Sequence, residues 1–214
     1  MRNIKRLILI VLCMLLLGGC SKVTNEKTMF ANDNVVFVQC GSIQGSGVIY
    51  QMDDDHVVVV TAAHVLSNGQ SVSVQHKKAD RIHWVDGLDL VFLVLDGVAL
   101  SVDVDPVGKK DDKDVAETET DNRLCLKGFD ATGTKREVNG IQTEKWIYVE
   151  DFGCHMMIGK ADAVPGMSGG GVFDQDGDFQ GIICGIDQDS NVAILPAAVI
   201  RSEYEVLFGD QSEK

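Results

Sequence analysis

Several things are scarce in this chain of 214 residues. Only 3 residues are proline and only 6% are aromatic. By contrast, 22 residues are glycine, 45% of the chain is hydrophobic and 24% is charged. This composition excludes a collagen-like or low-complexity chain and indicates a compact globular domain. Positive charge is also scarce: 19 basic against 32 acidic residues give a formal net charge of −13. A surface this acidic repels phosphate backbones, so we expect no nucleic-acid partner.

The chain also lacks a long hydrophobic segment. Its longest apolar run, Leu7–Leu17, has 11 residues and follows the basic start Met1–Arg6. That run is too short to span a bilayer, which takes about 20 helical residues. A basic start followed by a short apolar stretch indicates a secretory signal peptide over residues 1–19.

The residues after this run, Leu17-Gly18-Gly19-Cys20, resemble the lipobox of bacterial lipoproteins. The resemblance implies cleavage before Cys20 and a lipid on its thiol, which would anchor the protein to the bacterial cell envelope without a transmembrane helix. Ordinary secretion, with Cys20 as an unmodified cysteine, is the alternative. Residues 20–34 are predicted to be the lipidated cysteine and a polar tether.

Four further cysteines, at positions 40, 125, 154 and 184, show no metal-ligand spacing, so we expect no metal site. Outside the cytoplasm they could form disulfides, and their pairing stays open.

Short apolar runs separated by turn residues follow the tether and predict an all-β fold. Six strands are expected in each half, over residues 35–97 and 123–196, with a polar linker over 98–122. Helical spacing appears at the end, over Ala197–Phe208. The pattern predicts two six-stranded antiparallel β-barrels with a C-terminal helix. The expected strands are Val35–Cys40, Gly47–Gln51, His56–Thr61, Gln70–Gln75, Arg81–Val85, Leu90–Leu95, Leu124–Lys127, Trp146–Glu150, Cys154–Gly159, Gly171–Phe173, Phe179–Ile183 and Val192–Leu195.

Three segments could carry chemistry. His64 ends Thr61-Ala62-Ala63-His64 directly after four valines, and Asp89 opens a strongly apolar strand. A buried carboxylate needs a partner such as a histidine N–H. The third segment, Gly166–Gly170, places Ser168 between glycines that allow tight turns. Successive N–H groups in such a turn can bind an oxyanion while the serine Oγ attacks a carbonyl.

The order His64, Asp89, Ser168, together with Gly45–Ile49 and Gly177–Ile183, resembles trypsin/chymotrypsin-like serine proteases, most closely the bacterial HtrA-type protease domain. The resemblance covers about residues 35–208, and no PDZ domain is expected after it. It implies that Ser168 is the nucleophile, His64 the general base and Asp89 the residue that orients His64. The N–H groups of Gly166 and Ser168 would form the oxyanion hole.

The implied activity is hydrolysis of a polypeptide substrate through an acyl-enzyme, with no metal or organic cofactor. The chain departs from the family at Met167, where Asp or Asn is usual. A non-enzymatic binding module that keeps the protease fold is therefore the alternative function.

The resemblance also suggests a substrate pocket formed by Asp162, Cys184, Gly185 and Ile186. Asp162 at the pocket base would favour Lys or Arg before the scissile bond, the P1 position. Ile186 would narrow the entrance, and the HtrA register moves Asp162 out of the pocket. We therefore expect a small or medium apolar P1 residue.

Overall fold

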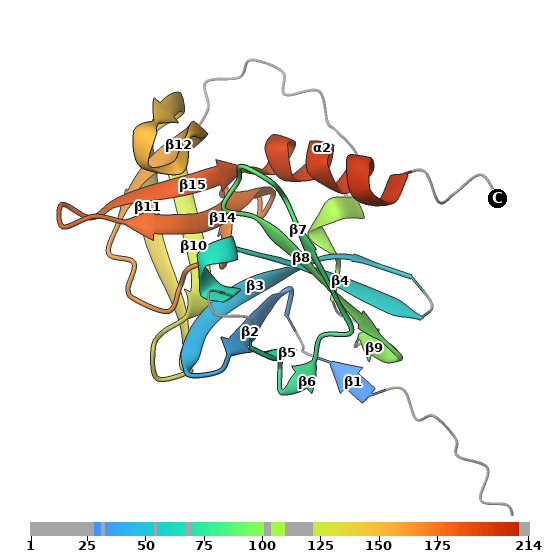
Figure 1. Ribbon diagram of the computed structural model, residues 1–214. Coiled ribbons are helices and arrows are strands. Elements are labelled where there is room, and N and C mark those ends of the chain that lie inside the picture. The colour runs from blue at the N-terminus through green and yellow to red at the C-terminus, as the bar shows by residue number, and fades with distance from the viewer. Residues whose placement is uncertain are drawn as a thin grey trace, which may run out of the picture.

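The computed structural model describes residues 28–30, 33–53, 55–66, 70–100, 104–109 and 122–209, and their strands form two large sheets and one short parallel pair (Figure 1). One C-terminal helix, α2 (Ala197–Phe208), has the predicted bounds. The predicted fold class, an all-β double barrel with a terminal helix, is confirmed in its architecture.

The second half is a closed six-stranded barrel with the strand order β10-β11-β12-β15-β14-β13. All of its pairings are antiparallel, and β10 closes the ring against β13. Its core contains Leu126, Met167, Val172 and Ile194. The strands are β10 (Arg123–Phe129), β11 (Lys135–Val149), β12 (Cys154–Ala161), β13 (Gly171–Phe173), β14 (Phe179–Ile186) and β15 (Asn191–Pro196).

The first half differs in detail from the expected six-stranded barrel. It is a curled seven-stranded antiparallel sheet, ordered β6-β5-β2-β3-β4-β8-β7, and among the described residues β6 and β7 do not pair to close it. The extra strand arises because residues 70–78 turn back at Gln75 and His76, which both have positive φ. The strands are β2 (Val35–Cys40), β3 (Ile43–Met52), β4 (His56–Thr61), β5 (Val72–Val74), β6 (Lys77–Lys78), β7 (Arg81–Trp84) and β8 (Val91–Asp96).

Two strands lie in segments predicted as tether and linker. β1 (Thr28–Phe30) pairs in parallel with β9 (Val98–Leu100), and a short 3₁₀ turn, η2, covers Val107–Lys109. Most of the predicted linker, Cys20 and the whole predicted signal peptide lie outside the described residues. In the part of the chain that is described, no helix is long and apolar enough to cross a membrane.

A shared core joins the two halves. It contains Tyr50 and Phe92 from the first sheet, Ile182 and Cys184 from β14, and Ile200 of α2. The rings of Tyr204 and Phe208 pack against Phe92 with centroids 5.9 and 5.8 Å away, so α2 holds the first sheet against the barrel (Figure 1). The side chains of this shared core are therefore held in place by packing against both halves.

Candidate active site

His64 and Asp89 meet at one end of the adjacent strands β4 and β8. His64 lies in a 3₁₀ turn, η1 (Ala63–Leu66), directly after β4, and Asp89 lies in the turn that leads into β8. One carboxylate oxygen of Asp89 accepts a hydrogen bond from the His64 backbone N–H at 2.9 Å. The other oxygen lies 2.8 Å from Nδ1 of the ring. With the Nδ1 proton directed at Asp89, Nε2 is left as a proton acceptor.

The loop around Ser168 presents free amide groups. Gly166 and Gly169 have φ angles of 98° and 80°, a region that side chains with a Cβ rarely adopt. The Met167 and Gly170 amides bond to the carbonyls of Val164 and Met167, at 3.1 and 2.9 Å. Within the described residues, neither the Gly166 nor the Ser168 amide has a hydrogen-bond partner. Two unpaired donors on either side of Met167 are suited to binding an oxyanion.

Ser46, on β3, fixes this loop from the first half of the chain. Its fully buried hydroxyl donates to the Gly166 carbonyl at 2.9 Å and accepts from the Phe129 amide at 2.7 Å. Its backbone amide also donates to the Ser168 carbonyl at 2.8 Å. The 166–167 peptide plane and the Ser168 backbone are therefore held by one buried residue. Ser46 belongs to the Gly45-Ser46-Gly47 match, but its contacts span 83 to 122 positions of sequence and could not be predicted.

The loop lies close to His64. A Cβ added to Gly169 would lie 2.3 Å from Thr61 Oγ1 and 3.0 Å from the Ala62 amide, two residues before His64. The Ser168 hydroxyl makes no hydrogen bond among the described residues, including to His64. Such bonds are often long in ligand-free enzymes and shorten when substrate binds.

Met167, which stands where the proteases that the sequence resembles usually have Asp or Asn, is held in place by burial. Its side chain is fully buried in the core of the second barrel, beside Leu126 and Val172. The Met167 backbone also lies close to Gly128, because a Cβ added to Gly128 would lie 3.1 Å from the Met167 Cβ. Apolar packing thus fixes the residue between the two free amides.

A depression of about 520 Å³ opens beside His64. One wall comes from the turn before β8 and the other from η3 (Glu150–Phe152), the tip of the β11–β12 hairpin. Its lining residues are His64, Gly87, Leu88, Asp89, Asp151, Phe152 and Cys184. The Cys184 Sγ lies 3.9 Å from the Asp89 carbonyl oxygen. Burial, and next the charge of Asp89, raise the pKa of this thiol well above its usual range.

The residues predicted to form a substrate pocket are not all brought together. Cys184 lines the depression beside His64, and Gly185 lies under the Phe152 ring, which an added Cβ would approach to 3.0 Å. Ile186 follows at the partly exposed end of β14. Asp162 is instead exposed beyond β12, where its Oδ1 lies 3.4 Å from the Ser190 hydroxyl.

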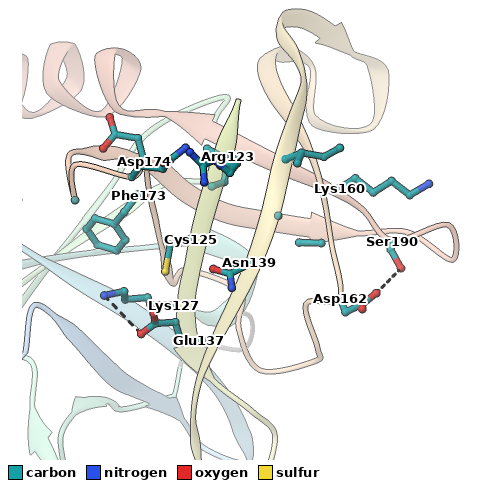
Figure 2. A pocket seen from close by; sticks show the side chains of 16 residues that line it. Arg123, Cys125, Lys127, Glu137, Asn139, Lys160, Asp162, Phe173, Asp174 and Ser190 are labelled. Atoms are coloured by element: carbon teal, nitrogen blue, oxygen red, sulfur yellow. Dashed lines mark hydrogen bonds and ion pairs between the residues drawn. The ribbon is translucent and has the colours of Figure 1, made fainter. Parts of the chain in front are cut away.

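Asp162 lines a separate and larger depression of about 930 Å³ on the second barrel. Figure 2 shows Asp162 and Ser190 facing each other at one end of it, apart from Cys125 and Phe173. None of His64, Asp89 and Ser168 lines this depression, so it is not the site of the proposed chemistry. The four cysteines 40, 125, 154 and 184 are free thiols in the structure, which makes none of the possible disulfides.

Residues 45–182 match the model of the trypsin-like peptidase domain family. Similar solved structures include a serine endoprotease from Yersinia pestis (21% identity, TM-score 0.63, 83% of this chain and 63% of that one). The active form of the Rv3671c protease from M. tuberculosis has 18% identity and a TM-score of 0.60, covering 80% and 79% of the two chains.

The MamO protease domain from Magnetospirillum magneticum has 20% identity and a TM-score of 0.56, covering 79% and 95%. No curated protein sequence matches the chain. These structural likenesses show the fold, and the family model extends over more than half of the sequence. The chain belongs to the trypsin-like peptidase domain family.

Proposed function

We propose that this protein is a serine endopeptidase whose catalytic triad is His64, Asp89 and Ser168. The observation that carries the proposal is the double contact of Asp89 with His64, at 2.9 Å to the backbone N–H and 2.8 Å to Nδ1. This arrangement sets the ring orientation and the tautomer that a general base requires. The free amides on either side of Met167 supply the second element, an oxyanion site.

In the proposed reaction, the Ser168 hydroxyl turns toward His64 and attacks the carbonyl carbon of the scissile peptide bond. Nε2 of His64 takes the hydroxyl proton, and Asp89 stabilises the imidazolium that results. The Gly166 and Ser168 amides bind the oxyanion of the tetrahedral intermediate. Nε2 then gives its proton to the departing amine, which leaves an ester on Ser168. Water, deprotonated by His64, hydrolyses that ester and regenerates the serine.

The location and the specificity complete the proposal. A lipid on Cys20 holds the enzyme at the bacterial envelope, and P1 is a small or medium apolar residue. Placement of the exposed Asp162 in a different depression from Cys184 supports an apolar P1 over Lys or Arg. If Cys20→Ser leaves the protein membrane-bound and of unchanged mass, the lipid proposal is wrong.

Hydrolysis of fluorogenic casein by the full-length protein tests the activity. Ser168→Ala and His64→Ala are expected to lower the rate by at least about a thousandfold. Ser71→Ala, an exposed serine in the first half, is the matched control and should keep the wild-type rate. A folded wild type that binds peptides without cleaving them would favour the binding module, an alternative supported by the missing hydrogen bond between Ser168 and His64.

A further inference from the structure

The depression beside His64 has apolar walls and one free charge at its rim. Leu88 and Phe152 are partly buried hydrophobic side chains that pack on the shared core, and the buried Cys184, whose Sγ lies 3.9 Å from the Asp89 carbonyl oxygen, also lines the depression. Asp151 is exposed and also lines the depression. A ligand there would therefore meet hydrocarbon along its length and a carboxylate at one end.

The tip of the β11–β12 hairpin positions this wall. Asp151 and Phe152 lie in η3, which ends at Gly153 with φ 63° and ψ 16°, and the Gly153 amide returns to the Val149 carbonyl at 2.9 Å. The Phe152 ring covers Gly185, where even an added Cβ would lie 3.0 Å from it. The turn is therefore packed against β14 and is a defined part of the site.

The two carboxylates of the depression differ in their partners. Asp89 is engaged by His64 through both of its oxygens. The Asp151 carboxylate has no hydrogen bond or ion pair in the described part of the chain. No Lys or Arg lines the depression, so the free charge at its rim is negative.

We propose that this depression binds a Lys or Arg side chain of the polypeptide substrate close to the scissile bond, with Asp151 as the specificity-determining residue. The inference rests on the proposed function and concerns a residue other than P1. The aliphatic stem of the basic side chain lies along Leu88 and Phe152, and its charged end reaches Asp151. A wholly apolar side chain would use the walls and leave Asp151 without a partner.

The test compares fluorogenic peptides that carry either lysine or norleucine at one position. Norleucine keeps the unbranched hydrocarbon stem and lacks the charge. The replaced position is moved through the three residues before P1 and the three residues after the scissile bond, while P1 stays a fixed apolar residue. The full-length protein is expected to prefer lysine at one position by about three- to fivefold in kcat/KM, the range of a partly exposed ion pair. The preference should shrink as salt is raised.

Asp151→Asn is expected to abolish the lysine preference, so that the kcat/KM of the lysine peptide falls to that of the norleucine peptide. Glu150→Gln is the matched control because Glu150 lies in the same turn, is exposed and does not line the depression. It removes the same charge and should keep most of the preference. Equal or better cleavage of norleucine peptides at every position, or a lysine preference that survives Asp151→Asn, would overturn the proposal.

Binding distinguishes this inference from the proposed function. The same peptides, labelled with a fluorophore, are titrated onto Ser168→Ala and onto Ser168→Ala/Asp151→Asn. If wild type cleaves nothing, the proposed activity fails, yet a Kd ratio favouring lysine that depends on Asp151 still supports the binding site. Equal Kd values for the lysine and norleucine peptides would refute the binding site whether or not the protein is a protease.

Discussion

Ser46→Ala tests whether the buried Ser46 hydroxyl positions the oxyanion loop around Gly166 and Ser168. It removes the hydroxyl that donates to Gly166 at 2.9 Å and accepts from Phe129 at 2.7 Å. Both partner groups, which are partly buried, would lose this hydrogen bond beside the fully buried Ser46. Each such loss costs about 1–3 kcal/mol in a buried site, and about 1–2 kcal/mol where the groups are only partly buried, so we expect the free energy of unfolding to fall by about 2–4 kcal/mol. A domain of ordinary stability, about 5–15 kcal/mol, still folds.

The activity of Ser46→Ala should fall for a different reason. Without the hydroxyl, the Gly166 carbonyl loses its anchor and the peptide planes beside the Gly166 amide can rotate. Complete loss of one oxyanion donor lowers kcat by about 100- to 1000-fold. The turn at Asp130 still confines Gly166, since an added Cβ would meet the Ala131 amide at 2.6 Å. We therefore expect a smaller decrease in kcat, about tenfold.

Urea unfolding and peptide hydrolysis, measured well below the unfolding temperature, separate the two effects. Thr61→Val is the comparator because it removes the 2.6 Å bond to the Ser46 carbonyl and leaves the Gly166 contact in place. It should lose stability with little change in kcat. A Ser46→Ala variant that is destabilised but keeps the wild-type kcat would refute the positioning role of Ser46.

Three further predictions concern single side chains. Met167→Asp would place an unpaired carboxylate in the barrel core and should lower the free energy of unfolding by several kcal/mol. Met167→Leu keeps an apolar side chain of similar volume and should lower it by less than about 1.5 kcal/mol. An unchanged Tm for Met167→Asp would show that the site is open to water. The Cys184 thiol, buried and with a raised pKa, should resist iodoacetamide in the native protein and react after denaturation, and rapid native alkylation would contradict its burial. Hydrogen bonds from Thr132 and Thr134, and then Arg136, hold the pKa of Asp130 far below its usual range. The ionised carboxylate therefore stabilises the fold above about pH 4, and this contribution is lost as the pH falls through the folded-state pKa. Between about pH 5 and 2, the urea midpoint of Asp130→Asn should fall less than that of the wild type, and equal decreases would refute this contribution.

The elements that bury a regular apolar face could be predicted from the sequence. The strand β4, with its four valines, and the helix α2 have the expected bounds. The strand β11 was predicted only over its last residues, although it covers Lys135–Val149. Most of its side chains are exposed, so no burial pattern marks it, and its backbone is held by the ladders to β10 and β12.

The candidate site divides in the same way. Local motifs identified His64, Asp89 and Ser168, and the structure joins the first two directly. The hydrogen bond from Ser46 to Gly166 and the packing of Phe152 against Gly185 join residues far apart in sequence, so no local sequence pattern predicts them. Asp162 and Cys184, which the resemblance groups in one pocket, line two different depressions: Asp162 follows β12 and lies beside Ser190, whereas Cys184 lies on β14 beside Asp89.

Labelling with a fluorophosphonate probe shows whether Ser168 is an activated nucleophile, since stable labelling requires an activated serine. The purified full-length protein is treated beside Ser168→Ala and His64→Ala, and the modified peptide is identified by mass spectrometry. The wild type is expected to carry the probe on Ser168, and both variants are expected to remain unlabelled. A folded wild type that does not react, or one labelled at another serine, would contradict a catalytic role for Ser168.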